Sequence, residues 1–342
     1  MAHQSDRPMD AIDLSLRQSA SELPAPMPEA EVGELAQLGA QGEDQTRRQA
    51  SLWGDAWRRL VRNRLAVIGM FVVVTFVVLA IVGPGVTVGD RTIIPSLAPY
   101  GESEVVDVRL ARYEPSWTWP FGLDANGRDI FSRILYGARV SLLVGVVAYI
   151  IILSIAIPIG SIAGYYGGWI DTILMRFVDV ISTIPQVLLV LMFVNWRGPG
   201  ITNIFLAIGL IGWVTEVRLI RGQFLTLREQ DYIKASRVAG AGGFFIILRH
   251  LLPNSMTPII VAATFGIPTA IFTEAAISFV GVGIRPPQAS WGQMVGSASQ
   301  PGIVQTDPHM LLFPVIAIGL TMLGFTFLGD GLRDALDPKG ND

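Results

Sequence analysis

The stretch EQDYIKASRVAGAGGFFIILRHLLPN, which spans Glu229–Asn254, is charged and rich in glycine although long apolar runs flank it on both sides. Its composition favours two short helices broken at Gly240, because glycine adopts a positive φ that strains other residues. Pro253 suits the first turn of a following helix, where no backbone hydrogen bond is lost. A protein that crosses a bilayer does not need such a polar segment for its own insertion, so the segment points to a separate role.

Composition places the chain among membrane proteins. Of its 342 residues, 51% are hydrophobic and only 15% are charged, and the mean hydropathy of +0.49 is unusual for a soluble domain. A formal net charge of −3 argues against nucleic-acid binding. Cysteine is absent and the three histidines are scattered, so we expect no disulfide, thiolate chemistry or metal site.

Six charge-free runs are long enough, or nearly so, to cross a bilayer, which requires about 17–25 residues. They are Leu65–Val82, Val140–Gly164, Val180–Trp196, Gly198–Thr215, Leu251–Thr273 and Met310–Gly329. Several contain proline, which membrane helices tolerate because neighbouring helices and waters satisfy the freed carbonyl groups. The sequence therefore predicts an all-α membrane protein with six transmembrane helices.

Basic residues predict the orientation. The stretch WRRLVRNR, Trp57–Arg64, carries four arginines before the first run, and Arg218–Arg249 holds six basic residues against two acidic ones. Because basic loops stay in the cytoplasm, we expect both termini and the quoted segment there, and the long loop Pro84–Ala138 on the outer side.

Four regions follow from these patterns. We expect residues 1–50, with nine acidic and four basic residues, to be a disordered cytoplasmic tail. Residues 51–138 would contain an amphipathic helix at the membrane interface, the first span and the outer loop. Residues 139–330 would hold the other five spans and the quoted segment, and residues 331–342 a cytoplasmic end.

No nucleotide-binding motif G-x-x-x-x-G-K-[ST] occurs, and no catalytic constellation stands out, so we expect no ATPase site of its own and no bound cofactor. Carboxylates within membranes are candidates for function. Asp179 and Glu216 lie at the inner edges of predicted spans, and Glu274 lies toward the outer end of the fifth. Each is close enough to an interface for us to expect a solvated side chain rather than a proton relay.

The quoted segment resembles the EAA loop of bacterial ABC importer permeases. That motif runs EAA, three residues, Gly, nine residues, then a hydrophobic residue, any residue, Leu and Pro. Here Lys234-Ala235-Ser236 is followed by Gly240 and then by His250-Leu251-Leu252-Pro253-Asn254 at the same spacing. Lys234 replaces the usual Glu and Ser236 the second Ala.

Three further stretches are similar to the C-type subunit of the dipeptide, oligopeptide and nickel importers. They are FGLDANGRDIFSRILYGARVSL (Phe121–Leu142), GYYGGWIDTILMRFVDVISTIP (Gly164–Pro185) and SFVGVGIRPPQASWGQM (Ser278–Met294). The resemblance covers about residues 51–338 and implies a type I ABC importer permease in the bacterial plasma (inner) membrane, surrounded by lipid. It leaves dipeptides, oligopeptides, nickel chelates and glutathione-like compounds open as cargo.

The resemblance also implies partners: a homologous permease subunit, two ABC ATPase subunits that hold ATP and Mg, and an extracytoplasmic peptide-binding protein. It assigns coupling with the ATPase to Lys234, Ala235, Ser236, Gly240, Ala241, His250, Leu252, Pro253 and Asn254, and contact with the binding protein to Asp124, Arg128, Asp129 and Trp291. For the outer loop, N-capping of a helix by Asp124 or Asn126 is an equal alternative. An ion-coupled carrier, or a membrane anchor that recruits partners through its tail, are the competing functions.

Overall fold

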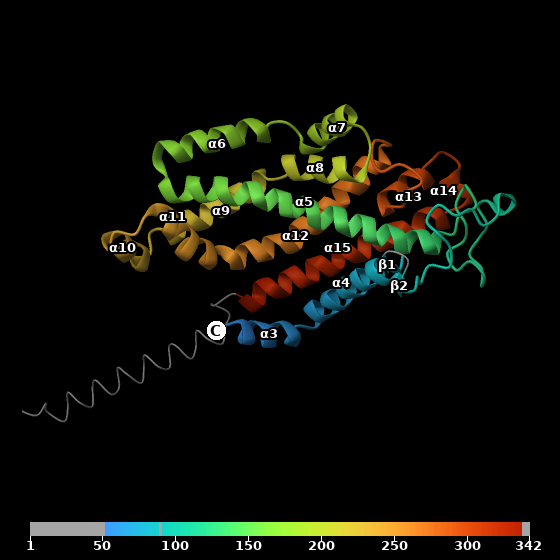
Figure 1. Ribbon diagram of the computed structural model, residues 1–342, viewed down its shortest axis with the longest axis horizontal. Coiled ribbons are helices and arrows are strands. Elements are labelled where there is room, and N and C mark those ends of the chain that lie inside the picture. Colours follow the sequence, from blue (N-terminus) through green and yellow to red (C-terminus); the bar gives the residue numbers. More distant parts are fainter. Residues whose placement is uncertain (1–51, 89–90, 337–342) are drawn as a thin grey trace, which may run out of the picture. The chain divides into compact units, whose positions relative to one another are not determined.

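A computed structural model of the chain describes residues 52–88 and 91–336, and Figure 1 shows how its helices are arranged. The predicted tail of residues 1–50 and half of the predicted C-terminal region, residues 337–342, lie outside the described residues. From Ala56 onward the chain forms one unit. The described residues of that unit are mostly helical, with turns between the helices and one short antiparallel pair, β1 (Val86–Val88) and β2 (Arg91–Ile94), which confirms the predicted fold class.

In the part of the chain that the structure describes, four helices are long and apolar enough to cross a membrane. They are α4 (Arg64–Val82), α5 (Ile130–Tyr166), α12 (Leu252–Phe279) together with the short helices before it, and α15 (His309–Leu336). The four correspond to the first, second, fifth and sixth predicted spans. Helix α5 begins ten residues before the predicted span, because the Asp129 side chain caps it by accepting the Ser132 N–H at 2.8 Å.

The third and fourth predicted spans are bent pairs of helices. Helices α6 (Gly168–Ser182) and α7 (Gln186–Arg197) meet at 76°, and α8 (Ile201–Ile211) and α9 (Val214–Leu227) meet at 41°. Pro185 stands at the first break, where its ring prevents continuation of a straight helix. The predicted runs miss most of α6 and of α9, because charged residues in both helices interrupt the apolar sequence.

Helix α3 (Leu52–Arg62) precedes α4, as predicted for the amphipathic stretch, and Asn63 caps α4 by accepting N–H groups of its first turn. Its buried residues Ala56 and Leu60 pack with Ala335 of α15. Helices α4 and α15 lie close together because glycine faces the partner helix: a Cβ on Gly69 would stand 2.6 Å from a carbonyl oxygen of α15.

Helix α5 is the central element. It packs against α4, α8, α9 and α12, and it runs between the two ends of the unit in Figure 1. At the end where α5 begins lie the 3₁₀ helix η1 (Val108–Leu110) and the short helices α13 (Trp291–Ala298) and α14 (Ile303–Thr306). At the other end lie α10 (Asp231–Val238) and α11 (Gly243–Ile246). The two ends carry different kinds of surface.

Candidate functional site: an exposed segment and a mid-span cavity

The polar stretch quoted above folds as the sequence predicts. Helix α10 ends at Val238, Gly240 has a φ of +84°, and α11 begins at Gly243. The Gly240 N–H donates to the Arg237 carbonyl, and the Ala241 N–H donates to that of Ser236, both at 3.0 Å. The turn is therefore a glycine-dependent break between two helices.

The second half of the segment runs directly into a spanning helix. A short π-helical turn, η2 (Ile247–Leu251), joins α11 to α12, and Pro253 stands in the first turn of α12 as predicted. The Asn254 amide donates to the His250 carbonyl at 2.6 Å. A displacement of α11 would therefore be transmitted to α12.

Contacts with the end of α5 hold the segment in place. The Arg237 guanidinium lies over the Tyr165 ring at 5.0 Å, and Arg228 donates to the Gly164 carbonyl at 3.2 Å. Ile233 and Ile246 are buried beneath the two helices. We call residues 228–251 the coupling segment, after the coupling with an ATPase that the sequence resemblance implies.

Large apolar side chains of the coupling segment point away from the protein. Val238 is 91% exposed and Phe244 is 73% exposed, and Tyr232, Phe245 and Leu248 are also exposed. Sequence reasoning did not single out these five residues. The available signal was their position in a charged stretch outside the predicted apolar runs, because exposed apolar residues beside charged ones are typical of an interface with another protein.

The sequence-predicted coupling residues surround this apolar surface. Lys234, Ala235, Gly240, Pro253 and Asn254 are exposed, whereas Ser236, Ala241, His250 and Leu252 are half-buried. The His250 ring contacts both Tyr232 and Phe245 edge-on. The structure thus brings the N-terminal and C-terminal halves of the motif to one surface.

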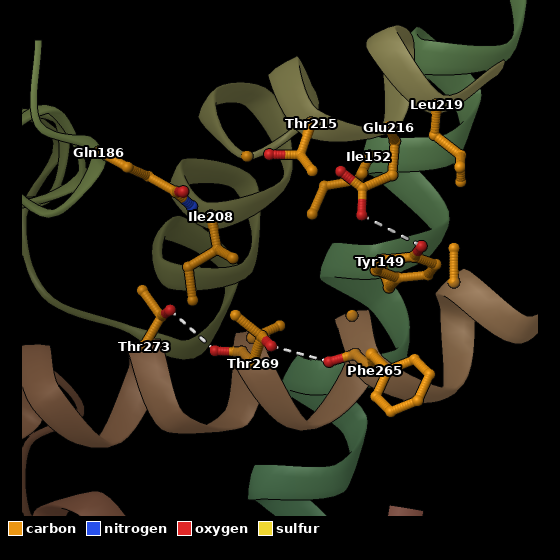
Figure 2. A pocket seen from close by; sticks show the side chains of 14 residues that line it. Tyr149, Ile152, Gln186, Ile208, Thr215, Glu216, Leu219, Phe265, Thr269 and Thr273 are labelled. Atoms are coloured by element: carbon orange, nitrogen blue, oxygen red, sulfur yellow. Dashed lines mark hydrogen bonds between the residues drawn. The ribbon is translucent and has the colours of Figure 1, made fainter. Parts of the chain in front are cut away.

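A cavity of about 340 Å³ lies between the middle parts of the spanning helices, as Figure 2 shows. Helix α5 contributes Tyr149 and Ile152, and Gln186 comes from the start of α7. Residues from α8, α9 and α12 complete the wall: Ile208, Gly212, Thr215, Glu216, Leu219, Ala262, Phe265, Gly266, Thr269, Ala270 and Thr273. Both helices adjoining the coupling segment, α9 and α12, therefore line this cavity.

Glu216 occupies the cavity wall, which corrects its expected place at the inner edge of a span. Helix α9 continues for eleven residues after Glu216, to Leu227, so the carboxylate lies about 16 Å from that end of the helix. The Tyr149 hydroxyl donates to Glu216 Oε1 at 3.3 Å across the cavity wall (Figure 2). Tyr149 fits against α12 because Gly266 has no side chain to meet the ring.

Glu274 was expected to be solvated, and that expectation is wrong. It is 0% exposed and accepts hydrogen bonds from the hydroxyls of Ser278 at 2.8 Å, Ser290 at 2.9 Å and Ser141 at 3.5 Å. These serines come from α12, the loop before α13 and α5. Glu274 therefore links α5, α12 and the loop before α13 through hydrogen bonds.

The residues assigned to contact with a binding protein are turned into the protein. Trp291, Arg128 and Asp129 are buried, and the Trp291 indole donates to the Ile134 carbonyl at 3.1 Å, so the predicted direct contact is wrong for these three. Asp124 is half-buried and pairs with Arg128 at 2.8 Å. The alternative prediction of capping by Asp124 or Asn126 is also wrong, because Asp129 caps α5.

Spanning helices around a cavity, joined to an exposed segment with an apolar surface, are the arrangement expected of a membrane transport subunit. The chain belongs to the family described as binding-protein-dependent transport system inner membrane components, which matches residues 156–341. Residues 51–115 match the N-terminal TM domain of oligopeptide transport permease C. These matches confirm the family that the sequence motifs indicated, whose members are multi-pass proteins of the bacterial plasma membrane.

Two curated relatives illustrate the match. The chain is 42% identical over 287 residues to the dipeptide transport system permease protein DppC of Bacillus subtilis (strain 168), covering 83% of this chain and 85% of that protein. It is 39% identical to the glutathione transport system permease protein GsiD of Shigella dysenteriae serotype 1 (strain Sd197), covering 84% and 90%. An inward-facing MetNI methionine ABC transporter superposes with a TM-score of 0.49 at 18% identity, covering 60% of this chain and 96% of that one.

Proposed function

We propose that this chain is the permease subunit of an ATP-driven peptide importer and forms half of the translocation pathway with a homologous permease. Two separate ATPase subunits hold ATP and Mg, and an extracytoplasmic binding protein delivers the cargo. The observation that carries the coupling role is the exposed apolar surface of the coupling segment, Val238 and Phe244 above all. Exposed apolar patches outside the bilayer are typical of protein interfaces.

The geometry explains how an ATPase would move the pathway. Helix α9 enters the coupling segment at Arg228 and α12 leaves it at Leu252, and both helices line the mid-span cavity. Rigid helices transmit displacement along their length, so closure of the ATPase dimer would tilt two walls of the cavity together. Alternating access follows without any covalent chemistry in this chain.

Peptide cargo is supported by the relatives and by the cavity. The relatives are named for dipeptide and glutathione transport. The cavity volume of about 340 Å³ lies at the lower end of the range for small-molecule pockets, about 300–1,000 Å³, and is lined by apolar and polar side chains. A short peptide has both kinds of group.

The coupling role is tested by removing the apolar surface. Val238→Ser combined with Phe244→Ser should abolish recovery of the ATPase subunits and peptide uptake, while the protein still inserts. The matched control is Val108→Ser at the other end of α5, since Val108 is also exposed. Normal ATPase recovery and uptake by the double variant would refute the coupling role.

The orientation is tested by labelling. Because the natural sequence has no cysteine, a single introduced cysteine is a unique probe. Ser236→Cys should react only from the cytoplasm and Val108→Cys only from outside. We expect residues 1–64, 228–250 and 331–342 inside and residues 90–130 outside; residues 218–227, which the basic residues alone would place inside, belong to the candidate span formed by α8 and α9. Labelling of Ser236→Cys from outside would refute this orientation.

An ion-coupled carrier is the second candidate, and the observation in its favour is a mid-span carboxylate, Glu216, on a cavity wall. Such a carrier would move cargo in vesicles that contain no ATPase subunit. Uptake that requires the ATPase subunits and ATP would exclude it.

A further inference from the structure

We propose that Glu216 binds the ammonium group of the cargo as the cargo crosses the mid-span cavity. The proposal rests on the proposed peptide function and adds a chemical role for one residue. It assigns the cavity a preference for compounds that combine a primary amine with a small apolar group.

Glu216 lacks a cationic partner in the structure. Among the described residues, its side chain has one hydrogen bond, from the neutral hydroxyl of Tyr149, and no salt bridge. The described cavity wall contains no lysine, arginine or histidine. Charged groups within a bilayer pair with an opposite charge or face a water-filled space, because isolation is costly. Glu216 has no such partner among the described residues and faces the cavity, so a cation that enters the cavity would gain a favourable partner.

A basic residue near Glu216 on the same helix is already engaged elsewhere. Arg218 donates to Asp179 and to the Ser182 hydroxyl, both at 3.0 Å, in a neighbouring cavity of about 230 Å³. The neighbouring cavity shares Thr215 and Gln186 with the first. The arginine therefore leaves the carboxylate of Glu216 uncompensated at its own cavity.

The remaining wall suits an amine attached to an apolar group. The Thr269 and Thr273 hydroxyls donate to carbonyls of their own helix, so their oxygens remain able to accept (Figure 2). Phe265, Ile152 and Leu219 supply the apolar surface. The α-amino group of a peptide is mostly protonated at neutral pH, so it offers the three donors that a carboxylate and nearby hydroxyls accept.

The test uses the complete transporter, reconstituted with its ATPase subunits and binding protein, and two probes of equal shape. These probes are the dipeptide Ala-Phe and its desamino analogue, propionyl-Phe. The measured quantity is the ratio of their import rates, compared between the natural protein and each variant. Selection by the binding protein cancels in that comparison, and so does the amount of transporter.

Glu216→Gln should lower the ratio about tenfold or more, because the amide offers no charge to the ammonium group. Glu216→Asp should preserve most of the ratio. Asp330→Asn is the matched control, since it removes an exposed carboxylate of α15 that does not line the cavity, and its ratio should stay within about twofold of the natural one.

Equal losses for both probes in Glu216→Gln would assign the residue a structural role and overturn the proposal. An unchanged ratio would overturn it as well, while leaving peptide import intact.

If the natural transporter imports only Ala-Phe, the comparison becomes the import of Ala-Phe by Glu216→Gln and Glu216→Asp at equal complex levels. A loss in the first with retention in the second supports the proposal, and equal behaviour overturns it. If the natural transporter imports neither probe, the proposed peptide function fails, and this proposal fails with it.

Discussion

The two ends of helix α5 both expose large apolar residues, such as Trp117 and Val238, but they differ in the polar side chains that they bury. At its beginning lies what we call the cap, residues 96–133 and 284–309, where charged and polar side chains point inward. Its buried polar residues are Arg128, Asp129, Ser132, Arg133, Ser290, Gln293 and His309. At its other end the coupling segment exposes large apolar residues, with Val238 and Phe244 the most exposed.

The difference separates residues that hold the fold from residues that meet a partner. Buried polar groups with their hydrogen bonds made are fixed in one arrangement, and loss of one leaves the others unsatisfied. Exposed apolar groups contribute little to the fold and are available to another protein. Substitutions in the cap should therefore lower stability, and those in the coupling segment should lower coupling.

Arg133→Met should have the largest effect on stability. Arg133 is 1% exposed, donates to the Glu102 carbonyl and to Gln293 Oε1 at 2.7 Å each, and lies 3.7 Å from Asp124. Its removal leaves the Glu102 carbonyl and Gln293 Oε1 without this donor, at a cost of about 1–3 kcal/mol for each unsatisfied buried group, while Asp124 keeps its pair with Arg128. The measurement is the melting temperature and yield of the purified complex.

The matched control for Arg133→Met is Arg109→Met, because Arg109 also lies in the cap but is exposed. We expect Arg109→Met to melt close to the natural protein. If the two variants had the same melting temperature, Arg133 would not stabilise the cap.

Glu274→Leu should rank second. The substitution removes the acceptor for hydroxyls of Ser278 and Ser290, and each unsatisfied buried group costs about 1–3 kcal/mol. Glu216→Leu is the comparison, since Glu216 has a single, longer hydrogen bond and faces a cavity. We expect thermal unfolding in detergent to shift clearly for Glu274→Leu and little for Glu216→Leu. The reverse order would contradict the distinction between a fixed and a free carboxylate.

Gly240→Val tests the coupling segment. A Cβ there would meet no atom within 4 Å in the part of the chain that the structure describes, so crowding is not the problem. The φ of +84° is the problem, and it strains a β-branched residue by about 1–3 kcal/mol. We expect insertion to persist while uptake and co-purification of the ATPase subunits are lost.

Gly242→Val is the control for Gly240→Val. Gly242 is equally open but has a φ of −68°, which any residue adopts. We therefore expect normal uptake from Gly242→Val. Normal uptake from Gly240→Val as well would show that the angle between α10 and α11 does not matter for coupling.

The sequence predicts those parts of the molecule that depend on local chemistry. Long apolar runs identify the spanning helices, Gly240 identifies the break between α10 and α11, and Pro253 identifies the first turn of α12. Both features follow from the solubility and backbone freedom of the residues themselves.

The sequence does not predict features that depend on distant partners. Helix α6 was missed in part because Asp171 interrupts the apolar run, yet Arg221 of α9 donates to Asp171 twice, at 2.5 and 2.6 Å. Likewise, no local pattern shows that Tyr149 meets Glu216, 67 residues away, or that Trp291 is buried. Such pairings arise only when the helices pack.

Lys234→Glu should have the smallest effect on uptake of these substitutions, and it tests whether a charged residue of the coupling segment also contributes to coupling. Lys234 is 54% exposed, and its ammonium lies 3.9 Å from Asp231, which is fully exposed, so water screens this pair. Any contribution of Lys234 to coupling would therefore come from a pair with an acidic residue on an ATPase subunit. An exposed pair of this kind changes an equilibrium by no more than about fivefold. We expect uptake to fall within that limit, and a charge reversal on the ATPase partner to restore it. Complete loss of uptake, with the complex still assembled, would show that the effect of Lys234 exceeds that of an exposed pair, so that the coupling segment also contains a charge on which coupling itself depends.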